Sequence, residues 1–297
     1  MVELVVVGTI GLDDIETPFG KVESVLGGSG VYASKASSFF TKTGLVSIVG
    51  KDMPEKGLAV INEVDLSGVE QSEKTFRWSG YYEFDMNEAK TKKTELNSLT
   101  EFKPKLPDNF KKAKYLFLGN IDPALQIEVL DQMENSPFIL LDTMNYWIDT
   151  KKEDLLKVIE RVDVLVINEG EARQLFGTPN LIKAGKMILE SGPKFGIIKK
   201  GEHGALLFSK EGFFSAPGYP LEVVKDPTGA GDSFAGGLIG YLAKTGDNSE
   251  KNMRKAIVYG STIASFCAEN FSLKYCDKLT LDNIEERYSA FEQIRKF

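Results

Sequence analysis

A glycine-rich segment at residues 226–237 carries the residue types most suited to chemistry in this chain of 297 residues. It reads Asp-Pro-Thr-Gly-Ala-Gly-Asp-Ser-Phe-Ala-Gly-Gly, between a short extended run at residues 222–225 and apolar helix formers at residues 234–242. The pattern predicts a strand, a tight glycine turn and a helix. The first turn of such a helix presents unpaired backbone N–H groups, and its dipole attracts anions.

An acid inside this predicted anion site indicates a reaction at the anion. Gly229 and Gly231 let the backbone approach an anion closely, because neither residue has a Cβ. The carboxylate of Asp232 would repel a phosphate that was only held there. It is useful if it accepts the proton of a hydroxyl that attacks the phosphate. The alternative is an ordinary strand-to-helix turn with an acid favoured by the helix dipole.

A second acid follows the first predicted strand. Leu4–Val7 is a continuous apolar run, typical of a strand that is covered on both faces. Asp13 lies just past its carboxyl end, where open α/β sheets bind ligands, although a turn residue is the alternative. Gly8 and Gly11 do not complete G-x-G-x-x-G, which argues against a nicotinamide enzyme.

Composition limits the class of protein. The length allows one large α/β domain, and the formal net charge of −7 disfavours a nucleic-acid partner. Cys267 and Cys276 have no C-x-x-C spacing, and the single histidine, His203, leaves little room for a nucleophilic triad. We expect a cytoplasmic protein, because cysteines without disulfide or zinc spacing fit reduced thiols in a cytosol. We expect no membrane contact, because the first residues form neither a basic leader nor a membrane span.

The second half of the chain alternates between strand and helix patterns. The predicted elements are residues 115–118, 123–133, 138–142, 153–161 and 162–168, which indicate a parallel sheet with right-handed crossovers. Asn120, Asp142 and Asn145 fall at carboxyl ends of strands. Asn120 is a candidate substrate ligand, and we expect the other two to line the rim.

Further elements are expected on both sides of this region. Strands are predicted at residues 45–49, 212–216 and 221–224, and a strand–turn–strand unit at residues 195–207. Helices are predicted at residues 57–64, 255–268 and 281–294.

Residues 76–85 alternate strictly, with Phe76, Trp78, Tyr82 and Phe84 on one face. This face is too aromatic for an edge open to solvent, so we expect it to be covered. Arg77 lies on the other face, where either a substrate contact or a surface ion pair fits it.

The glycine-rich segment resembles the second signature of the ribokinase, or PfkB-type, carbohydrate kinase family. The matching residues are Asp226, Pro227, Gly229, Ala230, Gly231, Asp232, Gly236 and Gly237. Stretches at residues 8–13, 27–33, 168–171 and 199–204 resemble further family features in the same order. The resemblance implies an α/β fold, with a ribokinase-like three-layer α/β/α core, a mostly parallel central sheet and a small β-sheet lid. Residues 1–297 would form a single kinase domain, with the lid built from about residues 14–26 and 74–100.

The resemblance also implies a reaction. The γ-phosphoryl group of ATP would pass, with Mg²⁺, to a hydroxyl of a sugar or sugar derivative. Asp232 would act as the base, and the backbone amides of Gly229, Ala230 and Gly231 would stabilise the transferred group. The sequence contains no G-x-x-x-x-G-K-[ST], so ATP binding by a P-loop is excluded.

Only some of the substrate-binding positions implied by the family carry its usual residue types here. Asp13 matches an aspartate that holds sugar hydroxyls, and Gly27 and Gly28 match glycines whose amides contact the substrate. Tyr32 stands where sugar-specific members commonly have an asparagine. Together with the aromatic lid, Tyr32 leaves open our alternative, a nucleoside kinase acting on adenosine or cytidine.

The resemblance assigns nucleotide and metal contacts as well. Asn168 and Glu171 match an N-x-x-E motif, in which the acid orients magnesium-bound waters, although the spacing also fits a capping box. Lys199, Gly201 and Gly204 match a K-x-G-x-x-G turn that contacts the nucleotide. Members that bind a monovalent cation such as K⁺ use the residues at Asp226 and Thr228, and the sequence leaves this cation open.

The family also suggests a homodimer through the β lid. Two functions of other classes remain open: a catalytically silent nucleotide or metabolite sensor, and a dehydrogenase. The presence of Asp232 argues against the first, and the incomplete glycine fingerprint argues against the second.

Overall fold

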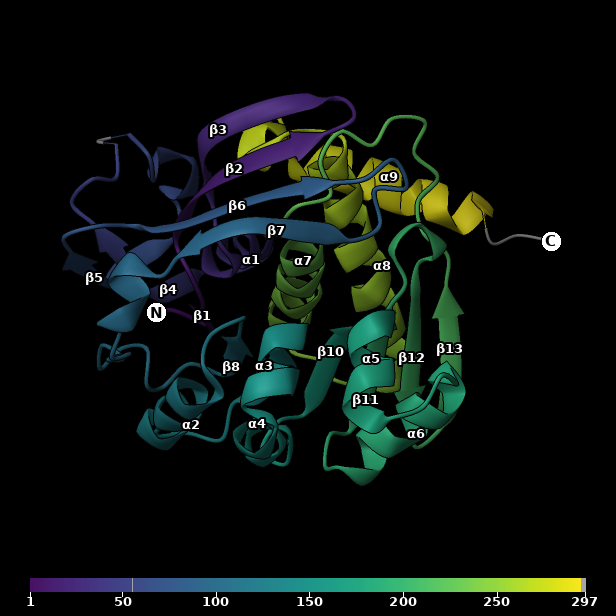
Figure 1. Ribbon diagram of the computed structural model, residues 1–297. Coiled ribbons are helices and arrows are strands. Elements are labelled where there is room, and N and C mark those ends of the chain that lie inside the picture. Colours follow the sequence, from purple (N-terminus) through teal and green to yellow (C-terminus); the bar gives the residue numbers. More distant parts are fainter. Residues whose placement is uncertain (55, 295–297) are drawn as a thin grey trace.

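A nine-stranded sheet forms the centre of the protein (Figure 1). The computed structural model describes residues 1–54 and 56–294. The strand order is β13-β12-β11-β10-β9-β8-β1-β4-β5. In this order, the strands from β11 to β5 run parallel to one another. Strand β12 is antiparallel to β11, and β13 is antiparallel to β12. The bounds are β1 Leu4–Val7, β4 Thr43–Gly50, β5 Asp65–Ser72, β8 Tyr115–Leu118, β9 Phe138–Asp142, β10 Val164–Asn168, β11 Phe195–Lys199, β12 Ala205–Ser209 and β13 Gly212–Ala216.

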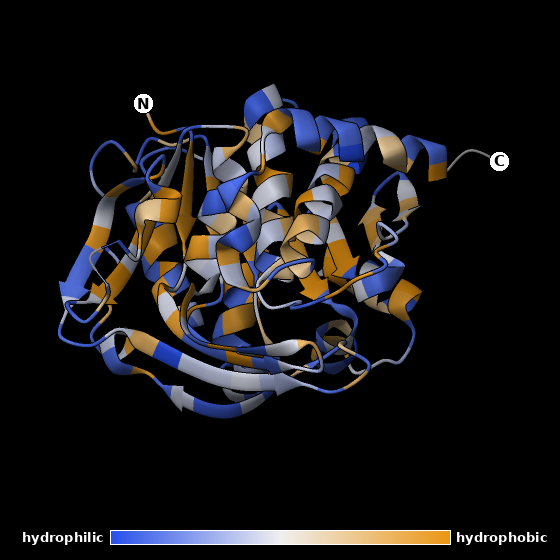
Figure 2. Ribbon diagram, turned by 90° about the horizontal axis from the view of Figure 1, so that it is seen from above, coloured by the Kyte–Doolittle hydropathy of each residue, from blue (hydrophilic) through white to orange (hydrophobic). Residues whose placement is uncertain are grey.

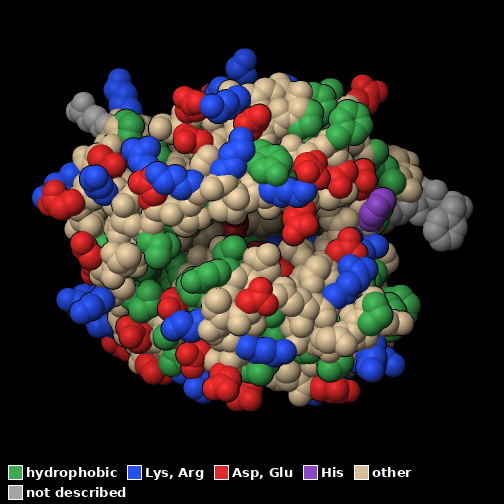
Figure 3. Space-filling view, in the orientation of Figure 1, with side chains coloured by type: hydrophobic (Ala, Val, Ile, Leu, Met, Phe, Trp, Pro, Cys, Tyr) green, Lys and Arg blue, Asp and Glu red, His purple; other side chains and the backbone are tan. Residues whose placement is uncertain are grey.

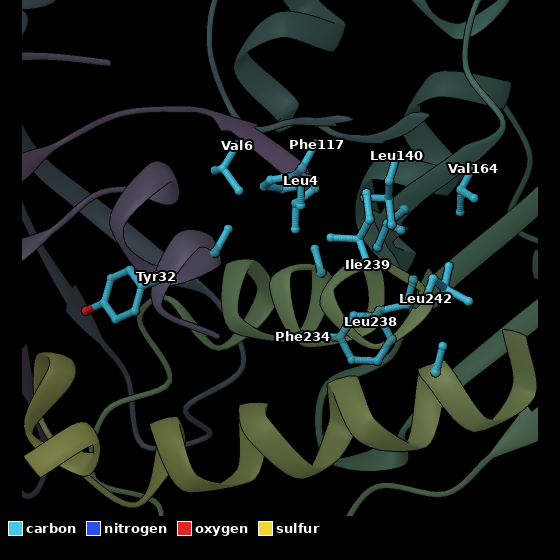
Figure 4. Packing of buried hydrophobic residues seen from close by; sticks show 14 of the residues in the cluster. Leu4, Val6, Tyr32, Phe117, Leu140, Val164, Phe234, Leu238, Ile239 and Leu242 are labelled. Carbon is cyan, nitrogen blue, oxygen red and sulfur yellow. The ribbon is translucent and has the colours of Figure 1, made fainter. Parts of the chain in front are cut away.

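Helices cover both faces of this sheet, which makes the core three layers thick. Leu4 and Val6 of β1 belong to one buried cluster with α7, whereas Val5 and Val7 belong to the cluster on the opposite face. This alternation follows from the two-residue period of a strand. Figure 4 shows Leu4 and Val6 in the cluster that contains Ile239 and Leu242 of α7, and Figure 2 shows hydrophobic strands enclosed by helices of mixed polarity.

The helices are mostly where the sequence predicts them. Their bounds are α1 Ser29–Ser38, α2 Pro123–Gln132, α3 Asn145–Thr150, α4 Lys152–Ile159, α5 Glu169–Phe176, α6 Leu181–Glu190, α7 Ala230–Thr245, α8 Glu250–Ala268 and α9 Leu281–Ile294. Short 3₁₀ turns occur at Ala59–Ile61, Asn97–Thr100, Gly201–His203 and Ser272–Asp277. Among the described residues, no helix combines the length and apolar character needed to cross a bilayer.

A separate four-stranded sheet, the small sheet, has the order β3-β2-β6-β7. Its strands are β2 Gly11–Thr17, β3 Gly20–Gly27, β6 Phe76–Tyr82 and β7 Ala89–Glu95. Strands β2 and β6 pair in parallel, and the outer pairs are antiparallel. Because β2 begins four residues after β1 ends, the small sheet lies over the carboxyl edge of the large one (Figure 1). The predicted α/β core and small β sheet are therefore confirmed, and a lid function for the small sheet stays a prediction.

Three local predictions are wrong. Residues 57–64 form only the 3₁₀ turn Ala59–Ile61. Residues 221–224 form no strand, and Val223 is 48% exposed. Prolines at positions 217, 220 and 227 remove backbone donors from this segment, which leaves edge strand β13 and crosses to α7. Strand β6 ends at Tyr82, so Phe84 lies in the following turn and is 91% exposed instead of covered.

Candidate active site

Several strands of the large sheet end at one edge, and α7 begins there. Figure 3 shows the surface hollowed between the small sheet and the part of the molecule that carries α3 and α5. Asp142 ends β9, Asn168 ends β10 and Lys199 ends β11. This is the edge at which open α/β sheets bind ligands, so the hollow is the candidate active site.

The N-terminus of α7 has an open first turn. Gly229 is its N-cap residue in the left-handed conformation, with φ 76°, and no side chain caps the helix. The backbone N–H of Ala230 bonds to Pro227 O at 3.0 Å, and that of Ser233 bonds to Gly229 O at 2.8 Å. Among the described residues, the N–H of Gly231 has no acceptor. Of the amides in the predicted anion hole, that of Ala230 is therefore already bonded and that of Gly231 is open. The segment that leads into the turn is irregular instead of a strand, and anion binding at the turn stays a prediction.

Asp232 lies in the same first turn and remains partly exposed. Its pKa is raised from 3.8 to about 7, first by burial and then by the charge of Asp142, while the Lys199 ammonium opposes the rise. A carboxyl group with a pKa near neutrality is suited to accept and release a proton at physiological pH.

Lys199 provides a partly buried positive charge beside this turn. Its Nζ lies 2.8 Å from Asp142 Oδ2, and a Cβ on Gly231 would lie only 3.1 Å from the same Nζ. Burial alone lowers the pKa of Lys199, but the charges of Asp142 and Glu171 more than offset that effect and raise it. The lysine therefore stays charged, and it faces the glycine turn.

Asn168 and Glu171 form a capping box at the start of α5. Asn168 Oδ1 accepts from the N–H of Glu171, and Glu171 Oε2 accepts from the N–H of Asn168, both at 2.8 Å. The capping interpretation is thus realised. Burial raises the pKa of Glu171 to about 7, and the charge of Lys199 opposes this rise. Lys199 belongs to the candidate site, so Glu171 lies within the range of its charge while it caps the helix.

Asp13 lies on β2 against a glycine-lined floor. A Cβ on Gly27 would lie 1.9 Å from Asp13 Oδ2, so only glycine leaves room for this carboxyl group. Gly28 has φ 98°, and its Cβ would meet Thr9 O at 2.5 Å. The pKa of Asp13 is raised to about 8 by burial first, and then by the charges of Asp226 and Asp232. Asp13 therefore lies near two acids of the glycine segment, and its contact with acceptor hydroxyls stays a prediction.

Tyr32 lies beneath the glycine turn. It is 1% exposed, and a Cβ on Gly229 would lie 2.5 Å from its ring. Figure 4 shows its hydroxyl turned away from the labelled aliphatic side chains of the core. This hydroxyl has no hydrogen-bond partner among the described residues. The ring supports the turn, and a direct substrate contact by Tyr32 stays a prediction.

Asp226 organises the approach to the turn. Its carboxylate accepts from the backbone N–H of Thr228 at 2.9 Å and from that of Ser272 at 3.2 Å. It is fully buried, and burial raises its pKa. Asp226 thus holds the loop together, and the monovalent-cation role of Asp226 and Thr228 is untested.

The remaining predicted residues have defined places. Arg77 forms an ion pair with Asp52 at 3.4 Å. This is the surface ion pair that the sequence left open as the alternative to a substrate contact. Asn120 Oδ1 accepts from Trp147 Nε1 at 2.7 Å, at the start of the loop after β8. Gly201 and Gly204 have φ 54° and 81° in the turn between β11 and β12. Their predicted contacts with substrate and nucleotide stay predictions.

Two residues of the site were not predicted in their observed roles. Asp142 is the ion-pair partner of Lys199, and the sequence signal for it was its position at the carboxyl end of a buried strand. Tyr82 Oη accepts from Thr228 Oγ1 at 3.2 Å, so the small sheet contacts the glycine segment directly. No sequence pattern relates Tyr82 to Thr228, which is 146 positions away.

The described residues fit an anion better than a bare metal. The open amide of Gly231 and the ammonium of Lys199 are donors suited to phosphate oxygens. Across residues 1–54 and 56–294, no group of three or more His, Cys, Asp or Glu could hold a metal ion by itself. Mg²⁺ usually keeps several waters and is bound through phosphate oxygens with one or two carboxylates, an arrangement that Glu171 and Asp142 could support.

Comparison with known proteins identifies the family. The sequence pattern of the pfkB family carbohydrate kinases matches residues 5–279. The chain belongs to this family. Kinases of the family use ATP with Mg²⁺ and transfer a phosphoryl group to a sugar or nucleoside hydroxyl, so the chain is a phosphotransferase.

Individual relatives include both substrate classes. The chain is 31% identical over 250 residues to a cytidine kinase of Thermococcus kodakarensis, covering 81% of this chain and 89% of that protein. It is 28% identical over 122 residues to fructokinase-2 of Zea mays, covering 40% of this chain and 36% of that protein. The crystal structure of a nucleoside kinase from Methanocaldococcus jannaschii superposes with a TM-score of 0.77 at 21% identity, covering 97% of this chain and 99% of that one. This last likeness confirms the ribokinase-like fold.

Proposed function

We propose that the chain is an ATP-dependent nucleoside kinase in which Asp232 acts as the base, with cytidine as the first candidate acceptor. The similarity to the cytidine kinase over four-fifths of this chain carries the choice of acceptor. A sugar or sugar derivative, which the sequence motifs alone favour, is the second candidate. The similarity to fructokinase-2 supports it over a shorter part of the chain.

The proposed chemistry uses the groups around the first turn of α7. The acceptor hydroxyl loses its proton to Asp232 as its oxygen attacks the γ-phosphorus of ATP. The bond between the γ-phosphorus and the oxygen that bridges to the β-phosphorus breaks, and ADP leaves with that oxygen. The open amide of Gly231 and the ammonium of Lys199 stabilise the negative charge on the transferred group. Mg²⁺, when bound, would neutralise charge on the phosphates, with Glu171 orienting its waters. Asp13 would hold hydroxyl groups of the acceptor at the small sheet.

Further candidate residues would contact the two substrates in this proposal. Asn168, Lys199, Gly201 and Gly204 would lie along the nucleotide, and Gly27 and Gly28 along the acceptor. A homodimer and a K⁺ requirement are further proposals that the family resemblance supports.

A panel of acceptors in an assay coupled to ADP formation tests the substrate. The panel contains cytidine, adenosine, ribose, fructose 6-phosphate and 2-keto-3-deoxygluconate. We expect the highest kcat/KM with cytidine. A higher value with a sugar would select the second candidate, and ATP binding without turnover of any acceptor would favour a sensor.

The variant Asp232→Asn tests the mechanism. We expect kcat to fall about 10²- to 10⁴-fold, because a positioned general base contributes about that much. ATP affinity and the thermal unfolding midpoint should be kept. The control is Asp108→Asn, since the side chain of Asp108 is 94% exposed on the surface. A kcat within a few-fold of the parent would exclude Asp232 as the base.

A further inference from the structure

Two neighbouring strands of the small sheet end on the segment that leads into α7. Thr17, the last residue of β2, donates from Oγ1 to Lys225 O at 2.9 Å. Tyr82, the last residue of β6, accepts from Thr228 Oγ1 at 3.2 Å. Because β2 and β6 are paired in parallel with Glu16 opposite Tyr81, Thr17 and Tyr82 lie side by side.

The third strand, β3, reaches the same segment through Ser272. Ser272 Oγ donates to Leu26 O at 2.6 Å, and the backbone N–H of Ser272 donates to Asp226 Oδ2 at 3.2 Å. Three of the four strands of the small sheet therefore hold residues 225–228, directly before the glycine turn.

Thr228 links the small sheet to the glycine turn. Its N–H donates to Asp226 Oδ1 at 2.9 Å, its O accepts from Cys267 Sγ at 3.5 Å, and its hydroxyl donates to Tyr82. The next residue, Gly229, lies against the ring of Tyr32. The turn is thus held by Tyr32 from α1 and by Tyr82 from the small sheet.

The same sheet carries the acid proposed to hold the acceptor. Asp13 lies on β2, whose hydrogen-bonded neighbour β6 carries Tyr82. Movement of the small sheet would therefore move the acceptor-binding acid and the Thr228 contact together. Phosphoryl transfer depends mainly on positioning, so an error of about 1 Å between acceptor and turn costs much of the rate.

We propose that Tyr82 is a positioning residue which, through its hydrogen bond with Thr228, aligns the Gly229–Gly231 turn with the acceptor held on the small sheet. The kinetic part of this inference rests on the proposed function. Burial raises the pKa of Tyr82, so the phenol stays neutral and keeps this bond over the working pH range.

The kinetic test compares Tyr82→Phe with Tyr81→Phe. The control removes a hydroxyl from the adjacent tyrosine, which faces the opposite side of β6 beside Lys92. For Tyr82→Phe we expect kcat to fall about fivefold, the equivalent of one net hydrogen bond, with KM for ATP and acceptor changed by less than about twofold. Tyr81→Phe should match the parent.

A double-variant cycle separates positioning from general loss of packing. Thr228→Val removes the same bond from its other end. If the bond carries the effect, Tyr82→Phe combined with Thr228→Val should be no slower than the slower single variant. Multiplying effects in the double variant, or a parental kcat in Tyr82→Phe, would overturn the proposal.

Hydrogen–deuterium exchange tests the contact without reference to any activity. We expect peptides covering residues 226–232 to exchange faster in Tyr82→Phe than in the parent and in Tyr81→Phe, because the turn loses one support. Equal exchange in all three proteins would overturn the positioning role. A parent that exchanges as expected but phosphorylates no acceptor would overturn the proposed function and leave the contact established.

Discussion

At the scale of single residues, the site gathers acids whose ionisation opposes folding. Burial raises the pKa of Asp13 to about 8, and those of Glu171 and Asp232 to about 7. Because each folded pKa exceeds the unfolded one, the stability linked to these protons is fully present below about pH 4. It is lost as the pH rises through 7 to 8. Lys199 is the partly buried cation that limits this cost, and the acids lie where the proposed reaction would use them.

The raised pKa of Asp232 predicts a pH profile. A general base works as the carboxylate, so kcat/KM should rise with pH through about 7 and level off above it. Initial rates between pH 5.5 and 9 at a fixed ionic strength measure this limb. The residual rate of Asp232→Asn should lack the limb, and a profile already flat at pH 6 would contradict the prediction.

At the scale of elements, two helices begin at the same sheet edge but differ in the capping of their first turns. The first turn of α5 is closed by the Asn168–Glu171 capping box, which uses its free amides. The first turn of α7 has no side-chain cap, and the left-handed Gly229 opens it toward the site. An uncapped helix N-terminus inside a hollow is a ready anion site, whereas a capped one is a support.

The opening at Gly229 can be tested against the other end of the same helix. Gly229 and Gly246 both have positive φ, 76° and 65°, but only Gly229 has a neighbour, Tyr32, within reach of an added Cβ. Gly246→Ala should lower the free energy of unfolding by about 1 kcal/mol through backbone strain alone. Gly229→Ala should lower it by about 2–3 kcal/mol in urea titrations and reduce kcat as well. Equal losses would show that the Tyr32 contact is unimportant.

Glu171→Gln separates the two roles of the acid on α5. Glutamine can still complete a capping box, so the thermal unfolding midpoint should be kept or rise. Without the charge, the Mg²⁺ concentration for half-maximal rate should rise about tenfold, as for other residues that orient metal-bound groups. A lower midpoint with an unchanged Mg²⁺ requirement would leave Glu171 only the capping role.

At the scale of the whole molecule, the large sheet supplies the fixed edge and the small sheet supplies the face above it. Phe19 and Phe84, in the turns of the small sheet, are 59% and 91% exposed. Large apolar side chains exposed in this way are common at interfaces between protein chains. They support the homodimer that the family resemblance suggests.

Light scattering coupled to size exclusion tests this assembly. We expect the parent to elute as a dimer, and Phe84→Asp to shift it toward the monomer, because a charge would be buried in the interface. Phe213→Asp is the matched control, since Phe213 is 63% exposed on β13 of the large sheet. A monomeric parent, or equal shifts in both variants, would exclude an interface at the small sheet.

Much of the fold could be predicted because its signals are local. The apolar run Leu4–Val7 and the periodic pattern of Leu281–Ile294 give the exact bounds of β1 and α9. Residues 221–224 have strand-forming side chains but meet no strand edge, so the prediction there failed. A strand needs a hydrogen-bonded neighbour, and that neighbour is not encoded in the segment itself.

The sequence by itself determined the family, the three-layer fold and the glycine turn with its acid, since these depend on residue types at short spacing. Only the tertiary structure decided that Asp142 pairs with Lys199, because β9 and β11 are both neighbours of β10. It also decided that Tyr82 contacts Thr228, and that Tyr32 lies beneath Gly229. Such contacts join residues far apart in the chain, and only the packing of whole elements brings them within bonding distance.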